Sequence, residues 1–207
     1  MRNARVQRIS INALFLAIIM LMSFVPQIGF ITIPGLVEIT LIPVVVFIGA
    51  YFLPFYGGIF LGTSFGILSL IVAFIRGAGN PTVIPFQNPL VSVLPRVIVG
   101  LLASIVFNFV RKKFYHNKKH IGIALGISGF SLSIIHTILV LAMLAIVNQW
   151  GWEYFVSVIT INSIIEAGLA LVLVPLIGVR LHSYVPKLSN LKVKQPKRAN
   201  KQVENIN

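Results

Sequence analysis

The chain has 207 residues, of which 57 per cent are hydrophobic and only 10 per cent charged, with a mean hydropathy of +0.95. Charged residues normally make up about a quarter of a globular domain, so this composition excludes an ordinary water-soluble protein and indicates a surface that faces lipid. The four glutamates, without any aspartate or cysteine, exclude Asp-dependent two-metal chemistry, aspartyl proteolysis, disulfide frameworks and thiolate sites.

Six predominantly apolar runs predict an all-α integral membrane protein, a six-transmembrane-helix bundle over residues 1–180. A bilayer core requires about 17–25 apolar residues per helix. The runs cover residues 9–25, 38–53 with Pro43 inside, 57–75, 89–110, 121–147 and 154–177. The start resembles a secretory signal peptide, but Pro26-Gln27-Ile28 stands where a small-x-small cleavage site is required. We therefore expect the first helix to be retained.

The basic residues predict the orientation of this bundle. Three precede the first span, five lie between the fourth and fifth spans, and seven follow the sixth, which makes fifteen of the seventeen. An even number of spans places all three groups on one face, and the positive-inside rule makes that face cytoplasmic. We therefore expect a plasma-membrane protein with both termini cytoplasmic. The net charge of +13 then requires no nucleic-acid partner, and residues 181–207 are expected to be a disordered basic tail resting on anionic lipid.

The opposite, external face has irregular connections. Residues 26–37 and 77–88 are rich in proline and glycine, which disfavour helix, and residues 148–153 form a short turn that carries Trp150 and Trp152. Irregular backbone at membrane depth persists only where protein covers it or where it lines a cavity. The first two segments are therefore expected to be lids over a site.

Arg96 is the least expected residue in the apolar runs, because it lies about 10 Å below the outer end of the fourth span. A charge at that depth requires a partner or an aqueous pocket. Glu166 and Asn162 on the sixth span and His136 on the fifth lie at comparable depths, so the four side chains are predicted to converge on an outward-opening cavity. A purely structural Arg96–Glu166 pair and a core role for His136 are the alternatives. Further binding candidates at the rim are Glu38, Gln87, Asn88 and Trp152, the last of which is otherwise an interfacial anchor.

Small residues recur at four-residue spacing on three spans. Ala13 and Ala17 form an AxxxA pattern, Gly58, Gly62 and Gly66 form a second row, and the fifth span carries Gly122 with Gly126. This spacing aligns small side chains on one helix face and permits close approach of another helix. The glycine rows favour packing within the bundle.

One motif suggests an enzyme. Gly126-Ile127-Ser128-Gly129 has the GxSG form of intramembrane serine proteases, but His136 lies about 12 Å further along the same helix. That distance is too long for a hydrogen bond between a nucleophile and its base. We therefore expect no enzymatic activity, no cofactor and no metal.

The stretches Glu38-Ile39-Thr40-Leu41-Ile42-Pro43 and Phe86-Gln87-Asn88-Pro89-Leu90-Val91-Ser92-Val93-Leu94-Pro95-Arg96, together with the AxxxA pattern, are the most specific features. In them the chain resembles the substrate-binding S component of energy-coupling factor (ECF) vitamin transporters over about residues 8–180, in the branch that contains the pantothenate components. The resemblance implies a subunit that binds a vitamin from outside and docks on a transmembrane coupling subunit with two ATP-hydrolysing subunits. It also implies that Ala13 and Ala17 form the docking seam. The missing GxxxxGK[ST] loop agrees with ATP binding elsewhere.

Pantothenate carries one carboxylate, two hydroxyls and an amide, so its site requires one cation and several neutral donors and acceptors. Arg96 supplies a fork for the carboxylate, Asn88 and Asn162 suit the neutral groups, and Glu166 suits the hydroxyls or the compensation of Arg96. Pantothenate is the substrate that we expect. Pyridoxine, a hydroxymethylpyrimidine, riboflavin and folate are alternatives within the family. A stand-alone proton-coupled carrier that uses Glu166 and His136 is the alternative from another class.

Overall fold

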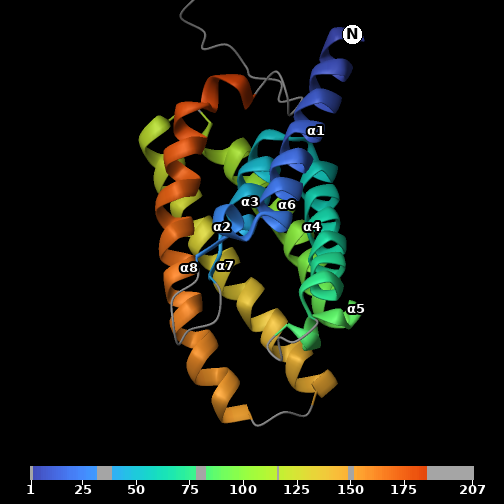
Figure 1. Cartoon of the computed structure of the whole chain (residues 1–207). Coiled ribbons are helices and arrows are strands. Elements are labelled where there is room, and N and C mark those ends of the chain that lie inside the picture. The colour runs from blue at the N-terminus through green and yellow to red at the C-terminus, as the bar shows by residue number, and fades with distance from the viewer. Residues whose placement is uncertain (1, 32–38, 78–82, 116, 149–151, 186–207) are drawn as a thin grey trace, which may run out of the picture.

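The structure is a computed structural model that describes residues 2–31, 39–77, 83–115, 117–148 and 152–185, and the side chains of residues 2–5, 26, 118, 148 and 152–161 lie outside that description. Helices build an elongated bundle (Figure 1). In chain order the elements are α1 (Arg2–Phe24), α2 (Pro26–Gly29), β1 (Phe30–Ile31), β2 (Ile39–Thr40), α3 (Ile42–Phe52), α4 (Phe55–Arg76), the 3-10 helix η1 (Ile84–Gln87), α5 (Pro89–Ser92), α6 (Leu94–Phe114), α7 (Lys118–Asn148), α8 (Trp152–Arg180) and the 3-10 helix η2 (His182–Tyr184).

Five helical segments of the described chain are long and apolar enough to cross a membrane. They are Val6–Phe24, Phe55–Arg76, Pro89–Phe114, Lys119–Val147 and Asn162–Arg180. Each overlaps one of the predicted spans. The all-helical membrane class is therefore confirmed, whereas the second predicted span, residues 38–53, has a different form.

The predicted span over residues 38–53 is the shorter helix α3, with 11 residues. Its predicted first turn is extended instead, because Ile39 and Thr40 of β2 pair antiparallel with Ile31 and Phe30 of β1. Pro43 then occupies the first turn of α3, where its missing N–H costs no helical hydrogen bond. A helix of this length rises about 16 Å and does not reach across a bilayer core of about 30 Å.

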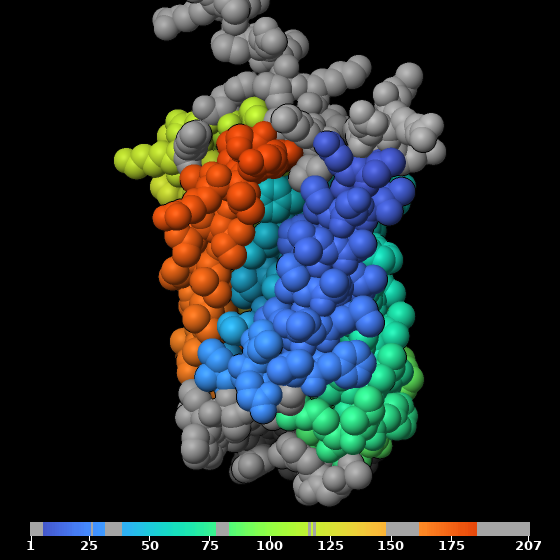
Figure 2. All heavy atoms as spheres, turned by 45° about the horizontal axis from the view of Figure 1, so that its top comes forward, coloured from blue at the N-terminus to red at the C-terminus, as the bar shows by residue number. Residues whose placement is uncertain are grey.

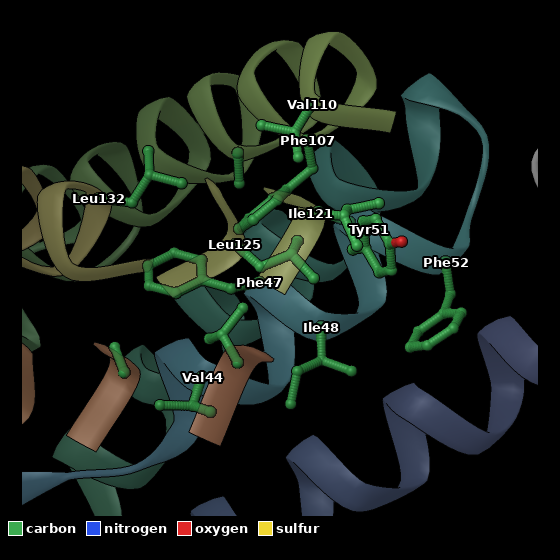
Figure 3. Close-up of a cluster of buried hydrophobic side chains, with 14 of the residues drawn as sticks. Val44, Phe47, Ile48, Tyr51, Phe52, Phe107, Val110, Ile121, Leu125 and Leu132 are labelled. Carbon is green, nitrogen blue, oxygen red and sulfur yellow. The ribbon is translucent and has the colours of Figure 1, made fainter. Parts of the chain in front are cut away.

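Helix α3 is the centre of the bundle. Ten of its eleven residues are buried, and it packs on α1, α4, α6 and α8. Phe47 and Tyr51 on α3 each contact the ring of Phe107 on α6, with 6.3 Å between centroids, and Figure 3 shows these side chains meeting those of Ile121 and Leu125 from α7. The apolar runs of the sequence thus enclose a helix that has almost no face for lipid.

The glycine row on the third predicted span packs within the bundle, as expected. A Cβ atom placed on Gly62 of α4 would lie 2.6 Å from the carbonyl oxygen of Arg96 and 2.8 Å from Cα of Gly100 on α6. On α7, a Cβ on Gly126 would lie 3.1 Å from the carbonyl oxygen of Leu171 on α8. Helices α4 and α6 therefore touch backbone to backbone beside Arg96.

The segments that carry the basic residues lie at one end of the bundle. The start of α1, the α6–α7 connection and the end of α8 are together at the top of Figure 1. This arrangement agrees with the predicted clustering, while the side of the membrane stays a prediction. Arg111 differs from its neighbours Lys112 and Lys113, which are exposed, because its own side chain is only 1 per cent exposed. Its guanidinium is enclosed by the end of α3.

The chain beyond Arg180 continues to pack on the bundle for a few residues. His182 of η2 is buried, its Nδ1 is hydrogen-bonded to the hydroxyl of Tyr51 at 2.6 Å, and its Nε2 lies 3.0 Å from the carbonyl oxygen of Tyr115. Residues 181–185, the first part of the predicted tail, therefore pack on the bundle. The rest of the predicted tail, residues 186–207, lies outside the described residues. So do residues 32–37 and 78–82, which belong to the two predicted lid segments.

Candidate functional site

The position of Arg96 follows from the proline before it. Pro95 lacks an N–H, so the carbonyl of Val91, four residues earlier, has no helical donor, and the helix is interrupted between α5 and α6. Nη1 of Arg96 donates to that Val91 carbonyl oxygen at 2.5 Å. The break in the helix thus orients the guanidinium toward the bundle interior.

Two aromatic rings flank the Arg96 guanidinium. Its Cζ lies 5.6 Å from the ring centroid of Phe65 on α4 and 5.5 Å from that of Phe86 on η1. A hydrogen bond from Ser92 Oγ to the Phe86 carbonyl holds η1 in place. Arg96 is 6 per cent exposed, and its Nε has no hydrogen-bond partner among the described residues. A buried cation with aromatic support and unused donors is suited to an anion.

His136 on α7 lies at the same place. It is 4 per cent exposed, and neither ring nitrogen has a hydrogen-bond partner in the described part of the chain. Its ring is 6.2 Å from that of Phe65, which therefore lies against both basic side chains. Buried polar groups are normally hydrogen-bonded, so His136 requires a partner that the described residues do not supply.

Arg96 and His136 line one cavity. The enclosed space is small, about 10 Å³, which is about the volume that one water molecule needs, and it is open on one side. Its other walls come from α3, α4 and α6, namely Pro43, Val46, Phe47, Gly62, Phe65 and Val99. Of the four side chains predicted to converge, Arg96 and His136 therefore meet at one small, mostly apolar space, and a ligand larger than water enters it only if its walls move apart.

The two candidates on α8, Asn162 and Glu166, are not among the residues that line this cavity. Asn162 is 4 per cent exposed. Oε1 of Glu166 accepts a hydrogen bond from the backbone N–H of Thr40 at 2.7 Å and thereby ties α8 to the strand that leads into α3. The charges of Glu166 and Arg96 attract each other, but the only hydrogen bond of Arg96 within the described chain goes to Val91. Glu166 therefore holds the entry of α3 rather than pairing directly with Arg96.

Gln87 and Asn88 make local contacts instead of lining the cavity. Oδ1 of Asn88 accepts from the N–H of Leu90 at 2.9 Å and caps α5, and Nε2 of Gln87 donates to the carbonyl of Ala73 near the end of α4 at 3.3 Å. Both side chains thus fix the connection that carries Phe86. Glu38 and the side chain of Trp152 lie outside the described residues.

The predicted docking residues lie on the outside of the bundle. Ala13 and Ala17 of α1 are both exposed. Figure 2 shows α1, in blue, uncovered along one face of the molecule. A small-residue seam on an uncovered membrane helix leaves room for a second helix.

Two features of the structure were not predicted from the sequence, namely the aromatic contacts of Arg96 and the hydrogen bonds of Arg111 to the end of α3. Nη1 of Arg111 donates to the carbonyls of Tyr51 at 2.6 Å, Leu53 at 2.5 Å and Ala50 at 3.4 Å, and Nη2 donates to Oδ1 of Asn108 at 3.2 Å. The Pro95-Arg96 pair did carry a signal, since a proline frees the carbonyl four residues earlier for a nearby donor. Arg111 stands in a cluster of basic residues, which predicts an exposed side chain, whereas the structure buries it.

Nothing in the described chain resembles a metal centre. No group of three or more His, Cys, Asp or Glu side chains comes together among those residues. The donors at the cavity are a guanidinium and an imidazole, which together with apolar walls suit an organic anion.

A family comparison identifies the class of protein that this arrangement belongs to. Residues 7–178 match the family described as "ECF transporter, substrate-specific component". The chain therefore belongs to this family of membrane transporter components, whose members bind a substrate and are not enzymes.

Two relatives carry more specific names. The chain is 29 per cent identical to a "Pantothenate transporter PanT" of Leuconostoc mesenteroides over 196 residues, which cover 86 per cent of this chain and 93 per cent of the relative. It is 24 per cent identical to a "Pantothenic acid transporter PanT" of Lactococcus lactis over 192 residues, which cover 84 and 92 per cent respectively. The likeness thus extends over nearly the full length of both relatives.

Proposed function

We propose that this chain is the pantothenate-binding subunit of an energy-coupling factor importer. The names of the two similar proteins support this substrate, and the observation that carries it is the buried guanidinium of Arg96. That group has one hydrogen bond within the described chain, lies between two aromatic rings and borders an apolar cavity.

The chemistry of pantothenate matches these groups. Its carboxylate requires a cation, and a guanidinium can hold a carboxylate in two parallel hydrogen bonds. Its quaternary carbon carries two methyl groups, which suit the walls formed by Val46, Phe47 and Val99. Asn162 is proposed as a further neutral contact, and Glu38 and Trp152 remain predicted contacts. Gln87 and Asn88 contribute indirectly, through the segment that holds Phe86 against Arg96.

Thermal unfolding of the detergent-purified protein tests the substrate. A ligand at 100 times its dissociation constant adds about 2.7 kcal/mol of stability, which a shift of the unfolding temperature reports. Pantothenate is expected to stabilise the protein, whereas pyridoxine, a hydroxymethylpyrimidine, riboflavin and folate are not. Stabilisation by one of those four alone would keep the transporter class and reject pantothenate.

A ligand pair tests the role of Arg96. Pantothenol carries CH₂OH in place of the carboxylate, so the wild-type protein is expected to prefer pantothenate by at least about tenfold, which corresponds to about 1.4 kcal/mol. In Arg96→Gln the preference is expected to vanish, because the cation is gone. A preference that persists in the variant would place the carboxylate elsewhere.

The partners that we propose are a transmembrane coupling subunit and two ATP-hydrolysing subunits, with Ala13 and Ala17 in the contact. Ala13→Leu is expected to abolish ATP-dependent uptake and co-purification with the coupling subunit, while pantothenate still stabilises the isolated protein. Ser131→Leu, which also enlarges a small exposed residue on a membrane helix, α7, is the matched control and is expected to retain uptake. Uptake that needs no coupling subunit, and that responds to a proton gradient, would favour the proton-coupled carrier instead.

The proposed location is the plasma membrane, with both termini on the cytoplasmic side. The chain has no cysteine, so single cysteines can be introduced without background. Cysteines at Lys119 and near the C-terminus are expected to react with an impermeant thiol reagent only in opened cells. Labelling of either in intact cells would contradict this orientation.

A further inference from the structure

His136 differs from an ordinary buried histidine of a helix bundle. A structural histidine donates or accepts at least one hydrogen bond, and His182 in this chain does so with both ring nitrogens. His136 is buried to a similar degree, yet both of its nitrogens lack partners within the described chain, and it lines the cavity with Arg96. Its hydrogen-bonding capacity is therefore directed at a ligand.

The surroundings of His136 restrict the kind of ligand group that it can meet. The side chains around it in the cavity are Val46, Phe47, Phe65 and Val99, so the group must be a polar atom attached to an apolar part of the ligand. Arg96 supplies the neighbouring cation, which leaves the anionic end of the ligand to that residue. An imidazole offers a donor and an acceptor in one plane, and a hydroxyl both donates and accepts.

We propose that His136 recognises a hydroxyl of the ligand and thereby sets its orientation, with the carboxylate at Arg96 and the hydroxyl-bearing, dimethylated part at His136. This inference rests on the proposed function. In pantothenate the two hydroxyl-bearing carbons flank the quaternary carbon with its methyl groups. A polar histidine within an apolar wall matches that arrangement.

Binding of three ligands to three proteins tests this assignment. The ligands are pantothenate and its two mono-deoxy analogues, and the proteins are the wild type, His136→Leu and His136→Gln. One analogue is expected to bind the wild type about 10- to 100-fold more weakly than pantothenate, because a buried partner would be left unpaired. His136→Leu is expected to bind pantothenate and that analogue equally, and His136→Gln, which keeps a donor and an acceptor, is expected to retain part of the preference. An unchanged preference in His136→Leu would overturn the proposal.

The stability of the ligand-free variants separates recognition from a structural role. Because the His136 nitrogens have no partners in the described chain, His136→Leu is expected to unfold at the same or a higher temperature than the wild type. His182→Leu is the matched comparison and is expected to unfold at a lower temperature, since Tyr51 loses its partner. A loss in His136→Leu as large as that in His182→Leu would assign His136 to the core and overturn the proposal.

The pantothenol comparison keeps this inference separable from the proposed function. If the wild type binds pantothenate and discriminates pantothenol through Arg96, a negative result with the deoxy analogues rejects the His136 assignment alone. If the wild type does not bind pantothenate, the substrate is wrong and the hydroxyl assignment falls with it.

Discussion

The two buried arginines of α6 lie near opposite ends of the helix and differ in the partners of their guanidinium groups. Arg96 and Arg111 are 6 and 1 per cent exposed, and they lie about 22 Å apart along one helix. Arg111 donates to three backbone carbonyls at the end of α3 and to the side chain of Asn108. Arg96 donates to one carbonyl and otherwise meets two aromatic rings and a cavity.

This difference separates an arginine that satisfies the fold, Arg111, from Arg96, which we propose binds the ligand. The last carbonyls of α3 have no helical donors, and the cation of Arg111 satisfies them where the helix dipole is negative. Both arginines have an unpaired Nε, but Arg96 donates to one backbone carbonyl only and lines the cavity at the other end of α3, beside Pro43, Val46 and Phe47. Helix α3 is therefore held at one end by Arg111 and borders the proposed binding site at the other.

The largest effect is expected from removing each arginine in turn. Arg111→Met should lower the free energy of unfolding by about 2–4 kcal/mol, because several buried carbonyls lose their donor. Arg96→Met removes one such bond and a buried charge, so its stability should change by less than about 1 kcal/mol or increase. Thermal unfolding of the ligand-free proteins in detergent measures both. Equal losses would remove the distinction between the two arginines.

The next effect concerns the backbone contact beside Arg96. In Gly62→Ala the added Cβ would meet the carbonyl oxygen of Arg96 at 2.6 Å, so α4 and α6 must separate. We expect a stability loss of about 1–3 kcal/mol together with weaker pantothenate binding. Gly168→Ala on α8 is the control, because its Cβ would have nothing within 4 Å, and its stability should be unchanged or slightly higher. A Gly62→Ala protein with normal stability and binding would show that this contact does not position Arg96.

The sequence was sufficient for the helical membrane class and for five of the six predicted spans, and it drew attention to Arg96 and His136, which line one cavity. Apolar run length predicted the spanning helices, since the bilayer fixes the length that a helix requires. The cost of an isolated charge at membrane depth identified Arg96, and His136 follows from the same reasoning. The four-residue glycine spacing predicted the close helix contact that Gly62 makes.

The remaining features depend on tertiary contacts that spacing does not encode. Helix α3 is short because β1 pairs with the residues that would otherwise begin it. Arg111 resembles its neighbours Lys112 and Lys113 in sequence, and only the approach of the end of α3 distinguishes it. Asn88 and Glu166 are polar residues near the site, but each has a side-chain oxygen that accepts a backbone hydrogen bond, from the N–H of Leu90 and of Thr40 respectively. A polar residue near the site thus predicts a hydrogen bond, but not whether the partner is backbone or ligand.

A smaller effect is expected from Asn108→Ala, which takes one acceptor from Arg111. Nη1 keeps its three carbonyls, so the loss of stability should be about 1 kcal/mol, well below that of Arg111→Met. Thermal unfolding again provides the measurement, and pantothenate affinity should be unaffected because the cavity lies at the other end of α3. A loss as large as that of Arg111→Met would mean that Asn108, rather than the carbonyls, fixes the guanidinium.

The smallest change in stability is expected from Glu166→Gln, which tests the Arg96 side of the comparison. The amide oxygen can still accept from the Thr40 N–H, so the stability should fall by less than about 1 kcal/mol. The negative charge that attracts Arg96 is removed, and a ligand carboxylate no longer competes with it, so pantothenate affinity should rise by a few-fold while pantothenol affinity stays constant. Calorimetric titration of both ligands measures these affinities. A strong fall in pantothenate affinity would mean that Glu166 contacts the ligand, and a loss of uptake with binding intact would indicate that its proton, rather than ATP in a partner, drives transport.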